Sequence, residues 1–211
     1  MKNKILCGCL LMLITTTPVS SGSLYPKGCL EADIIFLLDF SGSVAGYEDF
    51  ITDALKSFVL TTELSREGVQ VGYVVFSSYL RQTVELTDLE PILLNFIGML
   101  ENMQADGGTS LVAALEKSQT YFSESEKIRG KKVLQIIVCV SDGQFGDMHE
   151  TIHTAHVLKN NDVKIFCIQT ATEYQADGMR ILKQIATDEN YYFASDYVSL
   201  TETIQRLDIC M

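Results

Sequence analysis

The stretch ADIIFLLDFSGSV, residues 32–44, combines a buried strand with a cluster of polar side chains. Its first part, 32–39, is almost continuously apolar, as expected for a strand that is covered on both faces of a sheet. The run ends at Asp39, and Ser41 and Ser43 follow at a spacing of two residues. The glycine between the serines lets the chain turn. The stretch therefore predicts a strand that delivers one carboxylate and two hydroxyls to its carboxyl end.

Strands and helices alternate along the rest of the chain. Further strands are expected at 69–78, 79–87, 131–142, 163–170 and 191–196. Helices are expected at 47–62, 90–100, 109–122, 147–160, 177–188 and 198–209. This alternation predicts an α/β domain of the doubly wound type, with a mostly parallel six-stranded sheet and helices on both faces. Because the strand at 79–87 follows its predecessor almost at once, we expect it to be antiparallel, at the edge of the sheet.

Two more polar clusters fall in loops of this predicted fold. Asp106-Gly107-Gly108-Thr109 opens a helix, and Ser141-Asp142-Gly143 follows the strand at 131–142. In doubly wound domains, ligands bind outside the carboxyl ends of the strands, which is where these clusters should meet Asp39. Carboxylates and hydroxyls are hard oxygen donors that suit Mg²⁺, Mn²⁺ or Ca²⁺ better than zinc. Taken singly, each cluster could also be an ordinary helix cap or turn.

Taken together, these motifs resemble the metal-ion-dependent adhesion site of von Willebrand factor type A (VWA) domains. The resemblance covers roughly residues 29 to 210, and it is greatest to the extracellular matrix branch, the matrilins and filament-associated collagens. The matching motifs are Asp39-x-Ser41-x-Ser43, Gly107-Gly108-Thr109-Ser110 and Ser141-Asp142-Gly143.

The resemblance implies a role for each polar residue. Ser41 and Ser43 would bind the ion directly, and Thr109 would do so when a ligand is engaged. Asp39 and Asp142 would act largely through bound water. Mg²⁺ is the expected ion, with Mn²⁺ or Ca²⁺ as substitutes. The open coordination position would accept an acidic side chain of an extracellular protein partner, on matrix or a cell surface, so the expected function is adhesion and not catalysis.

Two features are expected to modify this function. Gly108 and Phe145 should form the rim around the ion, and Phe145 departs from the family because a small polar residue is usual there. Cys29 and Cys210 bracket the fold and are expected to form a disulfide that restrains the last helix. The other two cysteines of the mature chain, Cys139 and Cys167, lie in apolar strands and are expected to stay reduced and buried.

The N-terminal residues resemble a secretory signal peptide. Lys2 and Lys4 precede an apolar run at 5–14 that is too short to span a bilayer, and a cleavage after Ser21 is expected. The alternative is an N-terminal membrane anchor. With cleavage after Ser21, residues 22–211 would form a single secreted domain without a membrane span. Removing the leader moves the formal net charge from −11 to −13, which argues against nucleic acid as a partner.

A competing motif lies in the helix expected at 147–160. His149-Glu150-Thr151-Ile152-His153 has the spacing of a zinc metalloprotease motif. Met148, Ile152, Ala155 and Leu158 form the predicted apolar stripe of this helix, and helical geometry places His149, His153 and His156 on a flank away from it. A zinc protease needs a third ligand. His156 does not have the required spacing, and Glu173 and Glu189, which are possible in principle, lie beyond an intervening strand. A zinc hydrolase is therefore the weaker alternative. The other alternative is a structural matrix domain of the same family whose metal site is vestigial, although all five ligand positions are filled.

Overall fold

A six-stranded sheet forms the centre of the molecule. The computed structural model describes residues 31–170, 176–195 and 199–206, and the strand order is β3-β2-β1-β4-β5-β6. The strands are β1 (Ala32–Asp39), β2 (Val69–Phe76), β3 (Leu80–Thr87), β4 (Leu134–Ser141), β5 (Lys164–Thr170) and β6 (Tyr192–Ser195). All pairings are parallel except that of β3 with β2, at the edge. The predicted doubly wound sheet with one antiparallel edge strand is confirmed.

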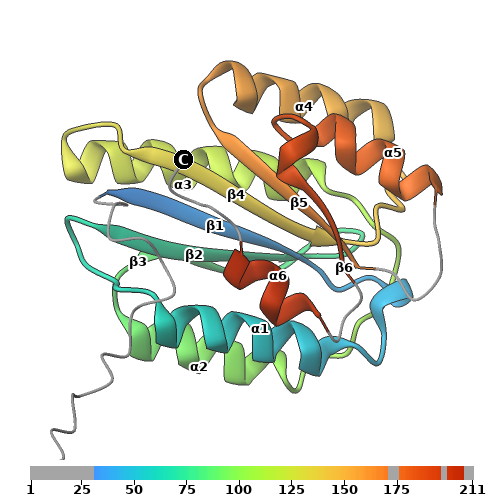
Figure 1. Ribbon diagram of the computed structural model, residues 1–211, viewed down its shortest axis with the longest axis horizontal. Helices are drawn as coiled ribbons and strands as arrows, with labels where there is room; N and C mark the ends of the chain where they lie inside the picture. The colour runs from blue at the N-terminus through green and yellow to red at the C-terminus, as the bar shows by residue number, and fades with distance from the viewer. Residues whose placement is uncertain (1–30, 171–175, 196–198, 207–211) are drawn as a thin grey trace, which may run out of the picture.

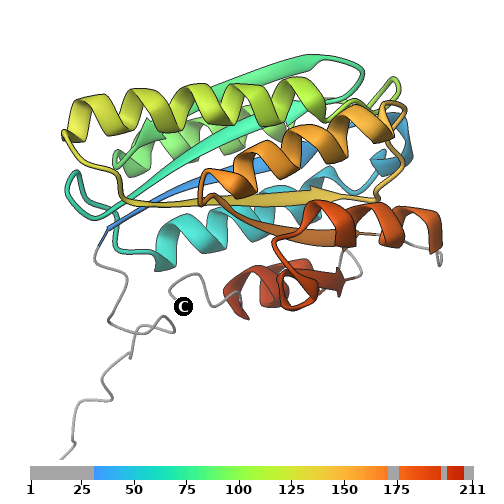
Figure 2. The same cartoon turned by 90° about the horizontal axis from the view of Figure 1, so that it is seen from above.

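Helices cover both faces of this sheet (Figure 1). One face carries α1 (Glu48–Thr61), α2 (Glu90–Leu100) and α6 (Leu200–Arg206). The other carries α3 (Val112–Arg129), α4 (Met148–Asn160) and α5 (Ala176–Ile185), which lie side by side in Figure 2. Two short 3-10 helices complete the described elements, at Gly42–Val44 and Glu189–Tyr191. None of the helices in the described ranges has the combination of length and apolar character needed to cross a bilayer.

The residues of β1 explain why it is the central strand. Every one of its side chains is buried, so the strand fits only between two helical layers. Phe36 and Leu38 join the hydrophobic core beneath α1, α2 and α6, whereas Ile35 and Leu37 join the core beneath α3, α4 and α5. This period-2 alternation places Asp39 on the same side of the sheet as α3 and α4.

Some helix boundaries differ from the predicted ones. The helix expected at 109–122 begins at Val112 and continues to Arg129, where Gly130 ends it with a left-handed φ of 69°. Residues 123–129 carry little apolar periodicity, so the prediction stopped too early, and the C-terminal glycine was the better signal. The last helix, expected at 198–209, is described over Leu200–Arg206.

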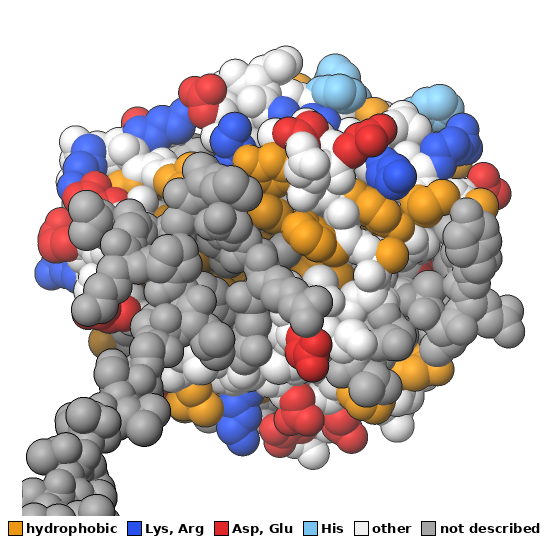
Figure 3. Space-filling view, in the orientation of Figure 1, with side chains coloured by type: hydrophobic (Ala, Val, Ile, Leu, Met, Phe, Trp, Pro, Cys, Tyr) orange, Lys and Arg blue, Asp and Glu red, His pale blue; other side chains and the backbone are white. Residues whose placement is uncertain are grey.

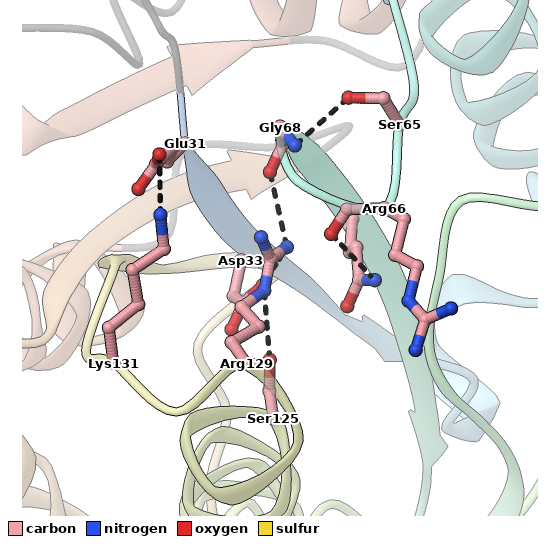
Figure 4. Close-up of polar contacts among 9 residues, drawn as sticks. Glu31, Asp33, Ser65, Arg66, Gly68, Ser125, Arg129 and Lys131 are labelled. Carbon is pink, nitrogen blue, oxygen red and sulfur yellow. Dashed lines mark hydrogen bonds and ion pairs between the residues drawn. The ribbon is translucent and has the colours of Figure 1, made fainter.

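A buried ion pair joins β1 to the end of α3, at the amino-terminal end of the strand (Figure 4). Arg129 Nη2 lies 2.9 Å from Asp33 Oδ1 and 3.1 Å from the Gly68 carbonyl oxygen. The two side chains are only 3% and 1% exposed. Burial raises the pKa of Asp33, and the Ser125 hydroxyl and the Arg129 guanidinium oppose that rise. Nearby, Lys131 pairs with Glu31 at the surface.

Candidate metal centre

The candidate site lies where the chain changes direction across the sheet. From β1 the chain proceeds to β2 and β3 on one side, then returns to β4 on the other. The carboxyl ends of the parallel strands all lie on the same side of the molecule, on the right in Figure 1. Asp39 ends β1 and Asp142 follows β4, so both carboxylates stand at this switch point. This is the position at which open α/β sheets bind their ligands.

Asp39 is completely buried at the end of β1. Its Oδ1 accepts a hydrogen bond from the Ser41 backbone N–H at 2.9 Å, and its Oδ2 accepts one from the Ser141 hydroxyl at 2.6 Å. Burial raises the pKa of Asp39 to about 6, the hydrogen bonds from Ser141 and Ser41 oppose this rise, and the nearby Asp142 carboxylate adds to it. The site thus holds a carboxylate whose charge is poorly compensated by the protein itself.

The first loop after β1 presents the two serine hydroxyls together. Ser41 Oγ and Ser43 Oγ lie 3.1 Å apart; Ser41 is buried and Ser43 is exposed. The intervening Gly42–Val44 turn is a 3-10 helix, and Ser41 makes no side-chain cap to it. The simpler interpretation of Ser41 as a helix cap is therefore not what the structure shows.

The second loop, residues 104–110, is bonded to the first. Gly42 N donates to the Gly107 carbonyl oxygen at 3.0 Å, and Gly108 N donates to Ser78 Oγ at 2.8 Å. Gly107 has a φ of 77°, a conformation that favours glycine. Thr109, half-buried, follows directly and precedes α3. The loop therefore carries Thr109 to the edge at which Asp39 and the serines lie.

The third loop follows β4 and holds Asp142, which is 3% exposed. Asp142 Oδ1 accepts from Gln144 N at 3.0 Å, and its Oδ2 accepts from Gln144 Nε2 at 3.1 Å. Gly146 N donates to the Thr109 carbonyl oxygen at 2.9 Å, which joins this loop to the second. The five predicted ligand residues therefore come from the end of β1 and from three loops, of which the second is hydrogen-bonded to both others.

The residues present fit a small divalent cation. In the described part of the chain, neither Asp39 nor Asp142 forms an ion pair with a lysine or arginine. Two buried carboxylates near each other without a cation are costly, and an ion of charge +2 would balance them. The hydroxyls of Ser41, Ser43 and Thr109 add neutral hard donors.

Sequence reasoning missed the residues that support this site. Ser141 and Gln144 hold the two carboxylates, and Ser78 holds the second loop. Ser141 stood in the quoted motif, but its role as a donor depends on its neighbour across the sheet, which the sequence does not reveal. Gly178 on α5 was also unrecognised. A Cβ there would lie 2.2 Å from the Asp142 carbonyl oxygen, so α5 packs directly on the third loop.

Gly178→Ala should displace the third loop. The added methyl meets backbone atoms that cannot move aside cheaply, so we expect about 1–3 kcal/mol of destabilisation and weaker ion binding. Gly98→Ala is the matched control, because a methyl added there on α2 would meet no atom of the described residues within 4 Å, and it should stabilise the protein by about 0.5–1 kcal/mol. Urea denaturation of both variants measures this. Equal stability of the two variants would contradict the close packing.

Of the two expected rim residues, only Gly108 is exposed. The Phe145 side chain is 6% exposed and belongs to the hydrophobic core beneath α3, α4 and α5. Its burial argues against direct contact with a partner and indicates that it supports the third loop from within. A sequence pattern cannot distinguish these roles, because the direction of a loop side chain depends on the packing of the helices around it.

The histidines lie far from the protein interior. His149, His153 and His156 are exposed on α4, as predicted. Histidine side chains are visible in pale blue on the surface in Figure 3. The buried residues of α4 are Thr151, Ala155 and Leu158, whereas the expected stripe residues Met148 and Ile152 are only half-buried. Over the described residues, no group of three or more histidine, cysteine or acidic side chains is placed to hold a metal. Glu173, considered as a third zinc ligand, lies outside those residues.

The cysteines divide as expected where they are described. Cys139 and Cys167 are free, fully buried and in register on β4 and β5. Their mutual contact and burial raise the pKa of the Cys139 thiol, which favours the reduced, protonated form. Cys29 and Cys210, like the leader 1–21, lie outside the described residues, so their disulfide stays a prediction.

Comparison with solved structures shows the same fold. Manganese-loaded TRAP protein of Plasmodium vivax superposes with a TM-score of 0.71 at 20% identity, over 87% of this chain and 75% of that one. Proximal thread matrix protein 1 of the mussel byssus was solved with a zinc-occupied MIDAS motif, the metal-ion-dependent adhesion site. It gives a TM-score of 0.66 at 25% identity, over 85% of this chain and 47% of that one.

Sequence comparison points to the same group of proteins. The human collagen alpha-6(VI) chain is 24% identical over 172 residues, which are 80% of this chain but only 7% of that relative's length. The chain thus spans a small fraction of the collagen relatives that it matches. The family model of the von Willebrand factor type A domain matches residues 33–206, and the chain belongs to this family.

Proposed function

We propose that the protein is a secreted module that binds an extracellular protein partner through a divalent cation. The ion would be held by Ser41, Ser43 and Thr109, with Asp39 and Asp142 balancing its charge. The observation that carries this proposal is the buried Asp39 carboxylate, which has no ion-pair partner in the described chain and lies near a second carboxylate. Mg²⁺ is the proposed ion, and Mn²⁺ or Ca²⁺ would substitute for it.

The chain's own residues set up an adhesive and not a catalytic site. Ser43, Gly107 and Gly108 are exposed, so the loops leave an approach from solvent. When bound, the ion would supply positive charge and a coordination position that accepts a partner's Asp or Glu side chain. The hydroxyl ligands are neutral, so they would leave the ion electrophilic toward that carboxylate. The Ser141 hydroxyl that bonds to the Asp39 carboxylate is completely buried, so it is not presented to a substrate.

The relatives support the same class of function. The matched proteins include collagen VI chains and the thrombospondin-related anonymous protein of Plasmodium berghei. Two solved structures of the same fold contain manganese or a zinc-occupied MIDAS motif. We carry from them only the proposal that a divalent cation binds at the equivalent loops here. Secretion, with residues 1–21 as leader, 22–211 as a single domain and a Cys29–Cys210 disulfide, belongs to the same proposal.

Thr109→Ala should remove partner binding without loss of fold, because Thr109 lies in a loop outside the hydrophobic clusters. The measurement is capture of matrix proteins on immobilised protein in Mg²⁺ and then in EDTA. Thr120→Ala is the matched control, since this exposed threonine lies on α3 and its hydroxyl bonds only within the helix. Capture that survives EDTA or Thr109→Ala would favour a vestigial site.

A further inference from the structure

The second and third loops of the site are joined by a short hydrogen bond between side chains. Ser110 Oγ donates to Asp147 Oδ2 at 2.5 Å, a distance typical of a hydroxyl bonded to a carboxylate. The two residues are 37 positions apart in the chain, and both are half-buried. A second bond runs beside it, from Gly146 N to the Thr109 carbonyl oxygen at 2.9 Å.

Neither residue serves the helix that it precedes in the usual way. Ser110 lies just before α3, but the N-cap of that helix is Leu111, and no side chain caps it. Asp147 is the N-cap residue of α4, yet its side chain accepts no backbone cap bond. Its carboxylate instead accepts from Ser110 and, through Oδ1, from the Thr151 hydroxyl at 3.0 Å. Serine and aspartate ordinarily cap helices, so this pairing across two loops calls for another explanation.

The position of the bond supplies that explanation. Ser110 follows Thr109 directly, and Ser110 N donates to the Ser77 carbonyl oxygen at 2.7 Å. Asp147 lies five residues after Asp142 and is the N-cap residue of α4. The bond from Thr151 to this carboxylate is local to α4, so the Ser110 bond is the one that connects the second loop to the third.

We propose that Ser110 and Asp147 form a latch that holds Thr109 in place relative to Asp142, and that both are positioning residues for the divalent ion. This inference rests on the proposed function. The latch restrains the second loop from moving independently of the third. The Thr109 hydroxyl is thereby held ready for the ion, so that less ordering is required on binding.

Ser110→Ala removes the latch and should weaken Mg²⁺ binding about tenfold, the lower end of the effect of losing a residue that orients a metal ligand. Thr151→Val is the matched control. It removes the other hydrogen bond of the same carboxylate, within α4, and should leave Mg²⁺ affinity within about twofold. Ser110→Thr keeps a hydroxyl and should restore binding. Calorimetric titration of Mg²⁺ into the four proteins, wild type included, measures this.

Amide hydrogen exchange in EDTA tests the latch without the ion. The Gly146 N–H, which donates to the Thr109 carbonyl oxygen, should exchange faster in Ser110→Ala than in wild type. Its exchange rate in Thr151→Val should equal that of wild type. Equal Gly146 exchange in wild type and Ser110→Ala, or equal weakening of Mg²⁺ binding in Ser110→Ala and Thr151→Val, would overturn the latch. If wild type binds no Mg²⁺ while the exchange difference is present, the latch stands as a loop restraint and the proposed function fails.

Discussion

Replacing Asp39 with asparagine should stabilise the metal-free protein at pH 7 and weaken its ion binding about 10–100-fold. The pKa of this buried carboxyl is about 6 in the fold, against an ordinary value of 3.8. The folded state therefore holds the proton more tightly than the unfolded chain does. Wild-type stability in EDTA should fall as pH rises from about 4 to about 6, by about 3 kcal/mol, and stay low above that window.

The variant should lose this fall, because an asparagine does not ionise. Its amide oxygen can still accept from the Ser41 N–H, and its amide nitrogen can donate to the Ser141 hydroxyl oxygen in place of the native bond. Urea denaturation in EDTA at pH 4, 5, 6 and 7 measures the difference. Asp53→Asn, an exposed change on α1, should follow wild type at every pH. A wild-type stability that does not fall between pH 4 and 6, or that falls equally in Asp39→Asn, would contradict the assignment.

Arg129→Met should destabilise the protein by about 3–5 kcal/mol, since it leaves the buried Asp33 carboxylate without its partner. The double change Asp33→Leu with Arg129→Met removes both charges and should recover most of the loss. One guanidinium nitrogen, Nη1, is buried and has no hydrogen-bond partner among the described residues, so the pair is imperfectly satisfied within that part of the chain. Urea denaturation of wild type, single and double variants gives the three free energies.

Lys131→Met is the control for this second prediction. It breaks the neighbouring Lys131–Glu31 pair, whose side chains are 44% and 41% exposed, and should cost at most about 1 kcal/mol (Figure 4). The comparison isolates burial, because both pairs join the same end of α3 and its following turn to the start of β1. Similar losses for Arg129→Met and Lys131→Met would show that the buried pair contributes no more than a surface one.

The sequence was sufficient to predict the fold because its strands are so strongly patterned. The continuous apolar run ending at Asp39 places β1 at the centre, and the short link before residue 80 makes β3 antiparallel. The ligand residues could be predicted as well, since hard oxygen donors recur at the ends of β1 and β4. These signals are local, and local signals are what a sequence shows most directly.

The supporting contacts could not be predicted, because they join residues that only the fold brings together. Ser110 and Asp147 both resemble ordinary helix caps, and only their 2.5 Å contact reveals a different role. The close approach of Gly178 to Asp142 depends on the docking of α5. Phe145 was predicted to lie on the rim from its place in the motif. The packing of neighbouring helices, which the sequence does not show, buries its side chain instead.

The most direct test of the account is anomalous diffraction from crystals of the protein grown with Mn²⁺. We expect one strong manganese peak at the carboxyl edge of the sheet, within about 2.0–2.6 Å of the hydroxyl oxygens of Ser41 and Ser43. Asp39 and Asp142 should lie around it, and Asp39→Asn crystals should show the peak weakened or lost. A map without manganese at these serines, or with its strongest peak at His149 and His153, would contradict the central claim.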